Sequence, residues 1–177
     1  MAATDLFVEN FKGRLAGGGA RSNLFKVYLN VQEWGGDNNT ASYLCKGASL
    51  PASTINEITV PLRGREIFVW GDRKFDPWTI TMLNDTDFDV RSAFERWMND
   101  IGNTHTTNLG IQAPVSYKRD MQVEQLDKAG NVLKAYNFVG VFPTVVGEID
   151  VSYDSSDTIE EFPVTLRYDY WTSDTTS

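Results

Sequence analysis

The sequence predicts a mainly β fold, an antiparallel β-sandwich or β-barrel subunit with one flanking α-helix. About nine segments alternate apolar and polar residues, rich in β-branched and aromatic types, between turns of Gly, Pro, Asn and Asp. A single stretch, residues 84–102, repeats its apolar residues at helical spacing. No internal repeat or linker composition divides the chain, so we expect one domain over residues 21–177, preceded by an N-terminal arm of residues 1–20.

Composition and charge limit the classes of function. The 177 residues carry a net charge of −8 and a pI near 4.6, which argues against a protein that grips nucleic acid through its phosphates. Cys45 is the only cysteine, so no internal disulfide is possible. The sequence has neither an apolar run of the roughly 20 residues that cross a membrane nor a secretory signal, so membrane insertion is not expected.

The N-terminal arm combines a short apolar cluster of Leu6, Phe7 and Phe11 with a run of glycines at 17–19. A glycine run beside arginines can cradle a phosphate, but this requires a preceding strand and a helix that opens with Lys and Ser or Thr. The sequence lacks that context, so residues 17–19 are interpreted as a flexible hinge.

Residues 24–31 begin the domain as a predicted strand. Its apolar side chains alternate along one face: Phe25, Val27, Leu29 and Val31. The polar, turn-rich residues 34–42 then predict a solvent-exposed loop. A calcium-binding loop is the weaker interpretation of this segment, because the distal bidentate glutamate is missing.

Short strands are predicted up to the helix, at residues 45–50, 54–62, 65–70 and 74–83. A turn at 63–64 joins the second and third of these strands into a hairpin, and a further turn is predicted at 71–72. Pro51 marks a bend or a sheet edge, because proline cannot donate a backbone hydrogen bond. The apolar face of the last of these strands consists of Trp78, Ile80 and Met82.

The predicted helix has recognisable ends. Thr86 is a suitable N-cap, Asp89 can answer it in a capping box, and Gly102 follows as a left-handed C-terminal cap. One face of the helix is apolar: Val90, Phe94, Trp97, Met98 and Ile101. We expect this face to pack across a sheet, anchored by Phe94, Trp97 and Met98.

The second half of the chain predicts two hairpins. The first joins residues 117–126 and 132–142 through a turn at 127–131, and the second joins residues 145–153 and 159–171 through a turn at 154–157. The last strand carries large side chains on both faces, which predicts that both faces become covered. His105, the only histidine, lies among threonines in a polar loop and is expected to be exposed.

No motif for catalysis or metal binding occurs in the sequence. It lacks His-Glu-x-x-His, Cys-x-x-Cys and Gly-x-Ser-x-Gly. Cys45 has no neighbouring histidine and is interpreted as a small buried residue. Carboxylate pairs such as Glu160 and Glu161 are expected from an acidic composition alone. We therefore expect no enzymatic activity, no cofactor and no metal.

The aromatic residues indicate assembly instead. The chain contains 5 Trp, 7 Tyr and 10 Phe, and Trp34, Trp70 and Trp171 lie in turns or on otherwise polar faces. Long hairpins also leave strand edges that must be paired or covered. Aromatic surface and open edges together predict that copies of the chain associate.

Several long segments closely resemble the tail tube proteins of contractile-tailed bacteriophages. The resemblance runs in order through residues 17–27, 48–55, 60–102 and 136–171. Its most specific parts are the clusters Gly-Asp-Arg at 71–73, Pro-Trp at 77–78, Asn-Asp-Thr at 84–86 and Glu-Arg-Trp at 95–97. These clusters are specific in combination, and none of them is specific alone.

This resemblance implies a structural role in a virion tail that is assembled in the host cytoplasm. Six subunits would form a ring, with their sheets joined edge to edge into a continuous barrel. Stacked rings would form a tube inside a contractile sheath, with sheath, baseplate and tape-measure proteins as partners and genomic DNA passing through the lumen without specific binding. Two alternatives remain open, the tube of another contractile injection system such as type VI secretion, and a free ligand-binding β-sandwich.

Two sets of residues are candidates for tube contacts. Residues 34–53 and the N-terminal arm are expected to reach a neighbouring ring, through Phe7, Phe11, Trp34, Tyr43 and Pro51. The channel wall is expected to carry polar side chains from two strands, Glu57 on one and Asp120, Gln122 and Glu124 on the other. An acidic wall would keep DNA from adhering. The alternative, that these polar faces point to outside solvent, is nearly as well supported by the sequence.

Overall fold

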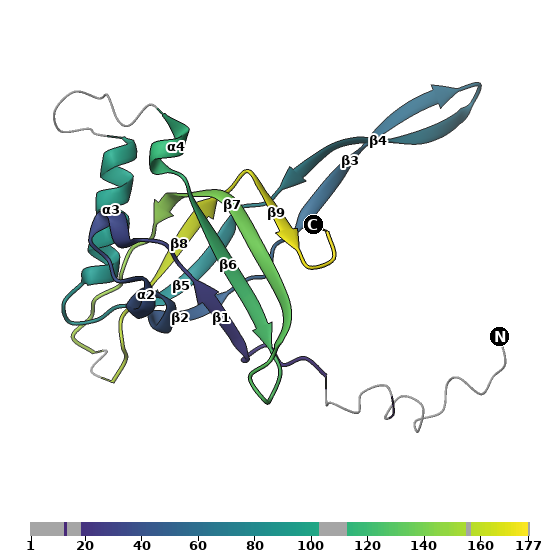
Figure 1. The fold of residues 1–177 in the computed structure, drawn as a ribbon. Coiled ribbons are helices and arrows are strands. Elements are labelled where there is room, and N and C mark those ends of the chain that lie inside the picture. Colours follow the sequence, from purple (N-terminus) through teal and green to yellow (C-terminus); the bar gives the residue numbers. More distant parts are fainter. Residues whose placement is uncertain (1–12, 14–18, 103–112, 155–156, 177) are drawn as a thin grey trace.

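The computed structural model describes residues 13, 19–102, 113–154 and 157–176, and Figure 1 shows its architecture. The predicted N-terminal arm lies almost entirely outside the described residues, as does His105. The strands are β1 (Phe25–Tyr28), β2 (Cys45–Ala48), β3 (Ser53–Leu62), β4 (Arg65–Phe75), β5 (Trp78–Leu83), β6 (Arg119–Leu126), β7 (Val132–Val146), β8 (Glu161–Arg167) and β9 (Tyr170–Ser173). The helices are η2 (Gln32–Trp34), α2 (Asn38–Leu44), α3 (Asp89–Ile101) and α4 (Pro114–Tyr117).

One seven-stranded antiparallel sheet forms the body of the subunit, in the order β1-β6-β7-β8-β5-β2 with β9 also paired to β7. Strand β7 divides this sheet into two parts. Its residues 132–141 pair with β6, and Tyr136–Val139 also pair with β9, which gives a first half-sheet of β1, β6, β7 and β9. Its residues 142–146 pair with β8, which gives a second half-sheet of β7, β8, β5 and β2.

The two half-sheets meet at a bend that Gly140 makes possible. Gly140 has φ +70°, a conformation that favours glycine, and an added Cβ would clash with the carboxylate of Asp169. Its N–H donates to Asp120 Oδ1 at 3.0 Å, opposite a register shift in the β6–β7 pairing. The chain from β8 to β9 bends at the same place, where Asp169 N–H donates to Val139 O at 3.0 Å.

A single core lies against the buried faces of both half-sheets. The alternation predicted for residues 74–83 is confirmed, because Trp78, Ile80 and Met82 are all buried. Trp78 stacks on Phe138 with ring centroids 4.1 Å apart, and its Nε1 donates to Ser49 O at 2.8 Å. The indole therefore joins the two half-sheets while its polar atom stays satisfied.

Helix α3 and its C-terminal cap at Gly102 are confirmed, but its predicted start and the left-handed conformation of the cap are wrong. Residues 85–88 form a turn in which Phe88 N–H donates to Asp85 O, so the helix begins at Asp89 instead of following Thr86. The residue before it, Phe88, has φ 55° and makes no side-chain cap. Gly102 has φ −128° instead of a left-handed conformation, although its N–H closes the helix on Met98 O.

The loop predicted at 34–42 is wrong, because most of it is helical. Asp37 caps α2 by accepting from Thr40 N–H at 2.9 Å and from Thr40 Oγ1 at 2.7 Å. These bonds lower the pKa of Asp37, first through the Thr40 hydroxyl and then through its N–H. Asn38 Oδ1 accepts from Val31 N–H at 2.8 Å. This hydrogen bond joins the start of α2 to the segment between β1 and η2.

The hairpin of β3 and β4 forms a separate two-stranded sheet that projects from the body (Figure 1). Its predicted turn is confirmed, with Arg63 at φ 48° and Gly64 at φ 79°, as in a two-residue hairpin loop. The turn predicted at 71–72 is wrong, because both residues lie within β4 at a register shift. A Cβ on Gly71 would lie 2.9 Å from Asn56 O, so this close approach explains the glycine.

The first hairpin predicted in the second half is confirmed as β6 and β7, although residues 114–117 form α4. The second is wrong. Strand β7 itself continues to Val146 and pairs with β8, and the described residues between 147 and 160 form no strand. The predicted last strand is divided into β8 and β9 because it follows the bend of β7.

Candidate assembly and channel surfaces

The first half-sheet has one buried face and one polar face. On β6, Met121 and Val123 are buried, whereas Asp120, Gln122 and Glu124 lie on the opposite face. The register extends this polar face across the neighbouring strands. Tyr28 pairs with Gln122 and Lys26 with Glu124 on one side, and Asn137 pairs with Gln122 on the other.

The carboxylate of Glu124 is held within this face. Its Oε2 accepts from Tyr28 Oη at 3.2 Å, and its Oε1 accepts from Gln122 Nε2 at 3.1 Å. Lys26 Nζ lies 4.4 Å from the centroid of the Tyr28 ring. The pKa of Lys26 is raised above its ordinary value, first by Tyr28 and least by the charge of Glu124. The face is therefore hydrogen-bonded and carries both signs of charge.

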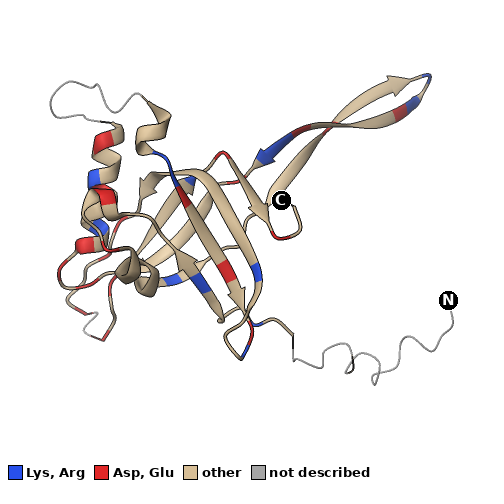
Figure 2. Cartoon of the chain, viewed as in Figure 1, with Lys and Arg blue, Asp and Glu red and all other residues tan. Residues whose placement is uncertain are grey.

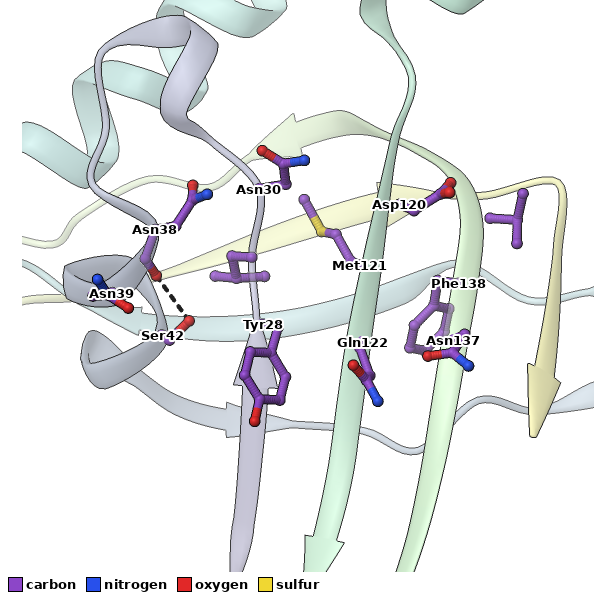
Figure 3. Close-up of a pocket in the computed structure, with 12 residues that line it drawn as sticks. Tyr28, Asn30, Asn38, Asn39, Ser42, Asp120, Met121, Gln122, Asn137 and Phe138 are labelled. Carbon is purple, nitrogen blue, oxygen red and sulfur yellow. Dashed lines mark hydrogen bonds between the residues drawn. The ribbon is translucent and has the colours of Figure 1, made fainter. Parts of the chain in front are cut away.

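A polar cleft of about 450 Å³ hollows this face beside α2 (Figure 3). Amide and hydroxyl side chains surround it: Tyr28, Asn30, Asn38, Asn39, Ser42, Gln122 and Asn137. Ser42 Oγ donates to Asn38 O at 2.8 Å. The residues that line the cleft include no histidine, cysteine or lysine. These groups, together with the Asp120 carboxylate that also lines the cleft, can order water or bind backbone.

The structure separates the four candidate channel residues. Asp120, Gln122 and Glu124 lie together on β6, although Asp120 is also bound to the Gly140 N–H at the bend. Glu57 lies on β3, where it pairs with Trp70 in the projecting hairpin. Sequence alternation identified the polar face of β6, but it could not identify Lys26 and Tyr28 as its continuation, because that depends on strand register.

The hairpin concentrates exposed apolar side chains in a short stretch of the chain. Every residue of β3 is exposed, and so is β4 apart from Gly71 and Phe75. Paired positions give the hairpin an aliphatic face: Ile58, Val60, Leu62, Ile67 and Val69. The other face carries Phe68 and Trp70, and Trp70 is 81% exposed. Apolar surface of this extent indicates a site of protein association.

Trp34 was predicted to stack on a neighbouring ring, but the structure buries it. Its side chain is only 5% exposed, and its indole stacks on Trp97 with centroids 4.1 Å apart. Trp34 Nε1 donates to Asp100 Oδ2 at 3.0 Å. The guanidinium carbon of Arg119 lies over the ring, 5.2 Å from its centroid. This side chain therefore belongs to the core of the subunit and not to its exposed surface.

The other candidates are placed as follows. Tyr43 on α2 is 84% exposed, and Pro51 is half-buried between β2 and β3. Phe7 and Phe11 lie outside the described residues. Of the helix anchors, Phe94 and Trp97 are fully buried, whereas Met98 is half-buried at the margin of the core.

Other chemistry is limited in the described part of the chain. Burial raises the pKa of the Cys45 thiol to about 11, which disfavours its reactive thiolate. The described residues contain no group of three or more His, Cys, Asp or Glu that could hold a metal ion. None of the described helices is long and apolar enough to span a membrane.

Comparison with known proteins identifies relatives over nearly the whole chain. The family model for phage tail tube proteins matches residues 20–174. The tail tube protein gp19 of Enterobacteria phage T4 is 38% identical over 153 residues, which cover 86% of this chain and 90% of that protein. Both matches span the body and the projecting hairpin.

Solved structures share the same fold at lower identity. The tube-terminating cap of the anti-feeding prophage superposes with a TM-score of 0.65 at 20% identity, over 90% of this chain and 92% of that one. The sheath/tube terminator of an extracellular contractile injection system, PVC, gives a TM-score of 0.62 at 17% identity, over 88% and 96%. These similarities confirm the mainly β architecture.

Proposed function

Because the chain belongs to the phage tail tube protein family, we propose that it polymerises as stacked hexameric rings that form the inner tube of a contractile tail. It is a structural component of the virion tail. Its tube would be the conduit for DNA ejection. The observation that carries the proposal is the arrangement of the first half-sheet, which has a free edge on each side and one polar face.

The two free edges support ring formation by sheet extension. Among the described strands, β1 pairs only with β6 and β9 pairs only with β7. An unpaired edge exposes backbone donors and acceptors that another strand can satisfy. The two edges lie at opposite sides of the same half-sheet, so β1 of one copy placed beside β9 of the next would continue the sheet. Repeated six times, this head-to-tail contact closes into a barrel without edges.

The polar face supports the orientation of each subunit in the ring. The opposite face of the first half-sheet is buried in the core, so only the polar face is left to line a water-filled channel. Glu124 and Asp120 would lie on the wall together with Lys26, Tyr28 and the amides. Such a wall offers DNA no continuous basic track, and a Debye length of about 8 Å limits the reach of its charges at physiological salt.

Further partners are part of this proposal. The sheath would pack around the outside of the tube, and the baseplate and tape-measure proteins would bind at its ends or inside it before DNA passes. One solved chain of similar fold comes from a structure of the PVC sheath/tube terminator. A tube in another contractile injection system is the second candidate, favoured by these fold similarities. The role proposed here is structural and non-enzymatic.

Electron microscopy of the purified full-length protein tests the proposal. We expect rings or tubes at high concentration, and faster growth when baseplate components are added as a nucleus. Analytical ultracentrifugation should show the monomer converting to large species as concentration rises. A strictly monomeric protein at high concentration, even with tail components present, would contradict the proposed function.

A further inference from the structure

The hairpin carries unpaired positive charge as well as its aliphatic face. Arg63 and Arg65 lie at its tip, and neither has an ion pair with a described residue. Both are exposed. Strand β3 is 10 residues long, and at about 3.3 Å per residue such a strand reaches roughly 33 Å. Glu66, which pairs with Pro61, follows Arg65 and alternates with it onto the other face of the hairpin. The hairpin can therefore hold its aliphatic face and these two arginines well away from its own body (Figure 2).

A cleft of opposite character lies on the other side of the molecule. This acidic cleft, a space of about 580 Å³, is lined by residue 148, residues 150–152, residues 158–161 and residue 163. Figure 1 shows this part of the chain far from the hairpin. Its walls include Glu148 and Asp150, which are exposed and have no ion pair with a described residue. Exposed Val151 and Ile159 supply apolar surface beside them.

Two other carboxylates of this acidic cleft already have partners. Glu160 Oε2 accepts from Asn84 Nδ2 at 2.9 Å, and Glu161 is paired with Lys46. Those contacts hold the start of β8 in place. The carboxylates that remain open for a partner are therefore Glu148 and Asp150.

We propose that the hairpin of one copy docks in the acidic cleft of a neighbouring copy, with Arg63 and Arg65 facing Glu148 and Asp150. The aliphatic face of the hairpin packs on the apolar residues of the cleft. This inference rests on the proposed tube function and identifies which surfaces of two copies meet. The two surfaces lie at opposite ends of one subunit, so the contact is head-to-tail and repeats from copy to copy.

Charge complementarity selects a second copy as the occupant. The hairpin brings cations and aliphatic side chains, and the acidic cleft offers carboxylates and aliphatic side chains. Nucleic acid does not suit the cleft, because its phosphates would meet these carboxylates. Opposite charges across an interface favour association and suppress pairing with the wrong surface.

Charge reversal gives a test with its own rescue. In variant one, Arg63→Glu and Arg65→Glu reverse the charge at the hairpin tip. In variant two, Glu148→Lys and Asp150→Lys reverse the charge of the acidic cleft. We expect each variant alone to raise the critical concentration for tube formation roughly tenfold or more. An equimolar mixture should assemble near the wild-type concentration, because alternating copies restore opposite charges at every contact.

Controls separate this inference from folding and from the proposed function. Lys128→Glu, on the β6–β7 turn, reverses a charge outside both surfaces and should leave assembly unchanged. Circular dichroism should show native folding for every variant. If the wild type forms tubes and both variants do so equally well, the docking is wrong while the tube function stands. A mixture that fails like its components also contradicts the docking, as does loss of sheath binding with normal tube growth.

Disulfide trapping tests the same contact without reversing the charge of either surface. In a Cys45→Ser background, Arg65→Cys combined with Asp150→Cys should give intersubunit ladders on oxidation of assembled protein. Lys128→Cys combined with Asp150→Cys is the control pair and should give none. Ladders from the control pair alone, or from neither pair in assembled tubes, would overturn the proposed docking.

Discussion

The indole ring of Trp97 lies parallel to that of Trp34, with centroids 4.1 Å apart and an angle of 9° between the planes. Trp97 Nε1 donates to Tyr117 O at 2.8 Å, and Arg96 Nη1 donates to Trp34 O at 2.8 Å. Helix α3 is thereby joined to η2 and to the end of α4, two residues before β6 begins. This contact holds the helix against the half-sheet proposed to line the channel.

Truncating this contact should destabilise the subunit strongly. Trp97→Ala removes a fully buried ring, and such changes cost about 3–5 kcal/mol in the free energy of unfolding. Trp97→Phe keeps a ring but leaves Tyr117 O without its donor, for which we expect a smaller loss of about 1–3 kcal/mol. Urea unfolding followed by tryptophan fluorescence measures both. Wild-type stability in Trp97→Ala would show that α3 does not pack as described.

The carboxylate of Asp120 should support the bend in β7 through its acceptor oxygen, with no need for its charge. Asp120→Ala leaves the Gly140 N–H without this partner, and we expect a loss of about 1 kcal/mol. Asp120→Asn keeps an acceptor and should be close to wild type in thermal unfolding. Equal loss in both variants would mean that the charge matters more than the hydrogen bond.

Acid should weaken the cap of α2. Hydrogen bonds from Thr40 lower the pKa of Asp37 below its ordinary value of 3.8. A carboxylate with a lowered folded-state pKa stabilises the fold above its unfolded pKa and loses that contribution as the pH falls through the folded value. We therefore expect the stability difference between wild type and Asp37→Ala to shrink in acid below the ordinary pKa. Asp37→Asn, a cap without a titrating group, is the control, and a pH-independent difference would contradict the assignment.

Position 124 should distinguish a channel wall from an outer surface. Glu124→Lys places a second cation beside Lys26, so tubes of this variant should retain short duplex DNA at low salt and release it as salt rises. Glu124→Gln keeps the hydrogen-bonding geometry without the charge and should not retain DNA. Glu57→Lys, on the hairpin, should affect assembly more than DNA retention. Free reaction of Glu124→Cys with a protein-sized maleimide in intact tubes would exclude a channel position.

Local patterns predicted most strands and the one long helix, because side-chain periodicity and turn residues act over a few neighbours. The alternation on β5 and β6 and the turn at 63–64 are examples. The bend at Gly140 could not be predicted, because it arises from pairing with β6 on one side and with β8 and β9 on the other. The cap at Asp37 was hidden in a segment whose composition is typical of loops.

The candidate site was predictable only in part for the same reason. Alternation placed Gln122 and Glu124 on one polar face, but the register that adds Tyr28 is a long-range property. Trp34 was assigned to the surface because its polar neighbours suggested solvent, whereas its stacking partner Trp97 is distant in sequence. Exposure of the whole hairpin followed from the tertiary structure, since its own sequence reads as an ordinary amphipathic pair of strands.

A cryo-electron microscopy reconstruction of tubes assembled from the purified protein would show which strands of each subunit form the inner wall. We expect an inner wall of β1, β6, β7 and β9 from each subunit, with β1 hydrogen-bonded to β9 of the next subunit and Glu124 facing the channel. An inner wall built from β2, β5 and β8, or rings in which β1 and β9 remain unpaired, would contradict it.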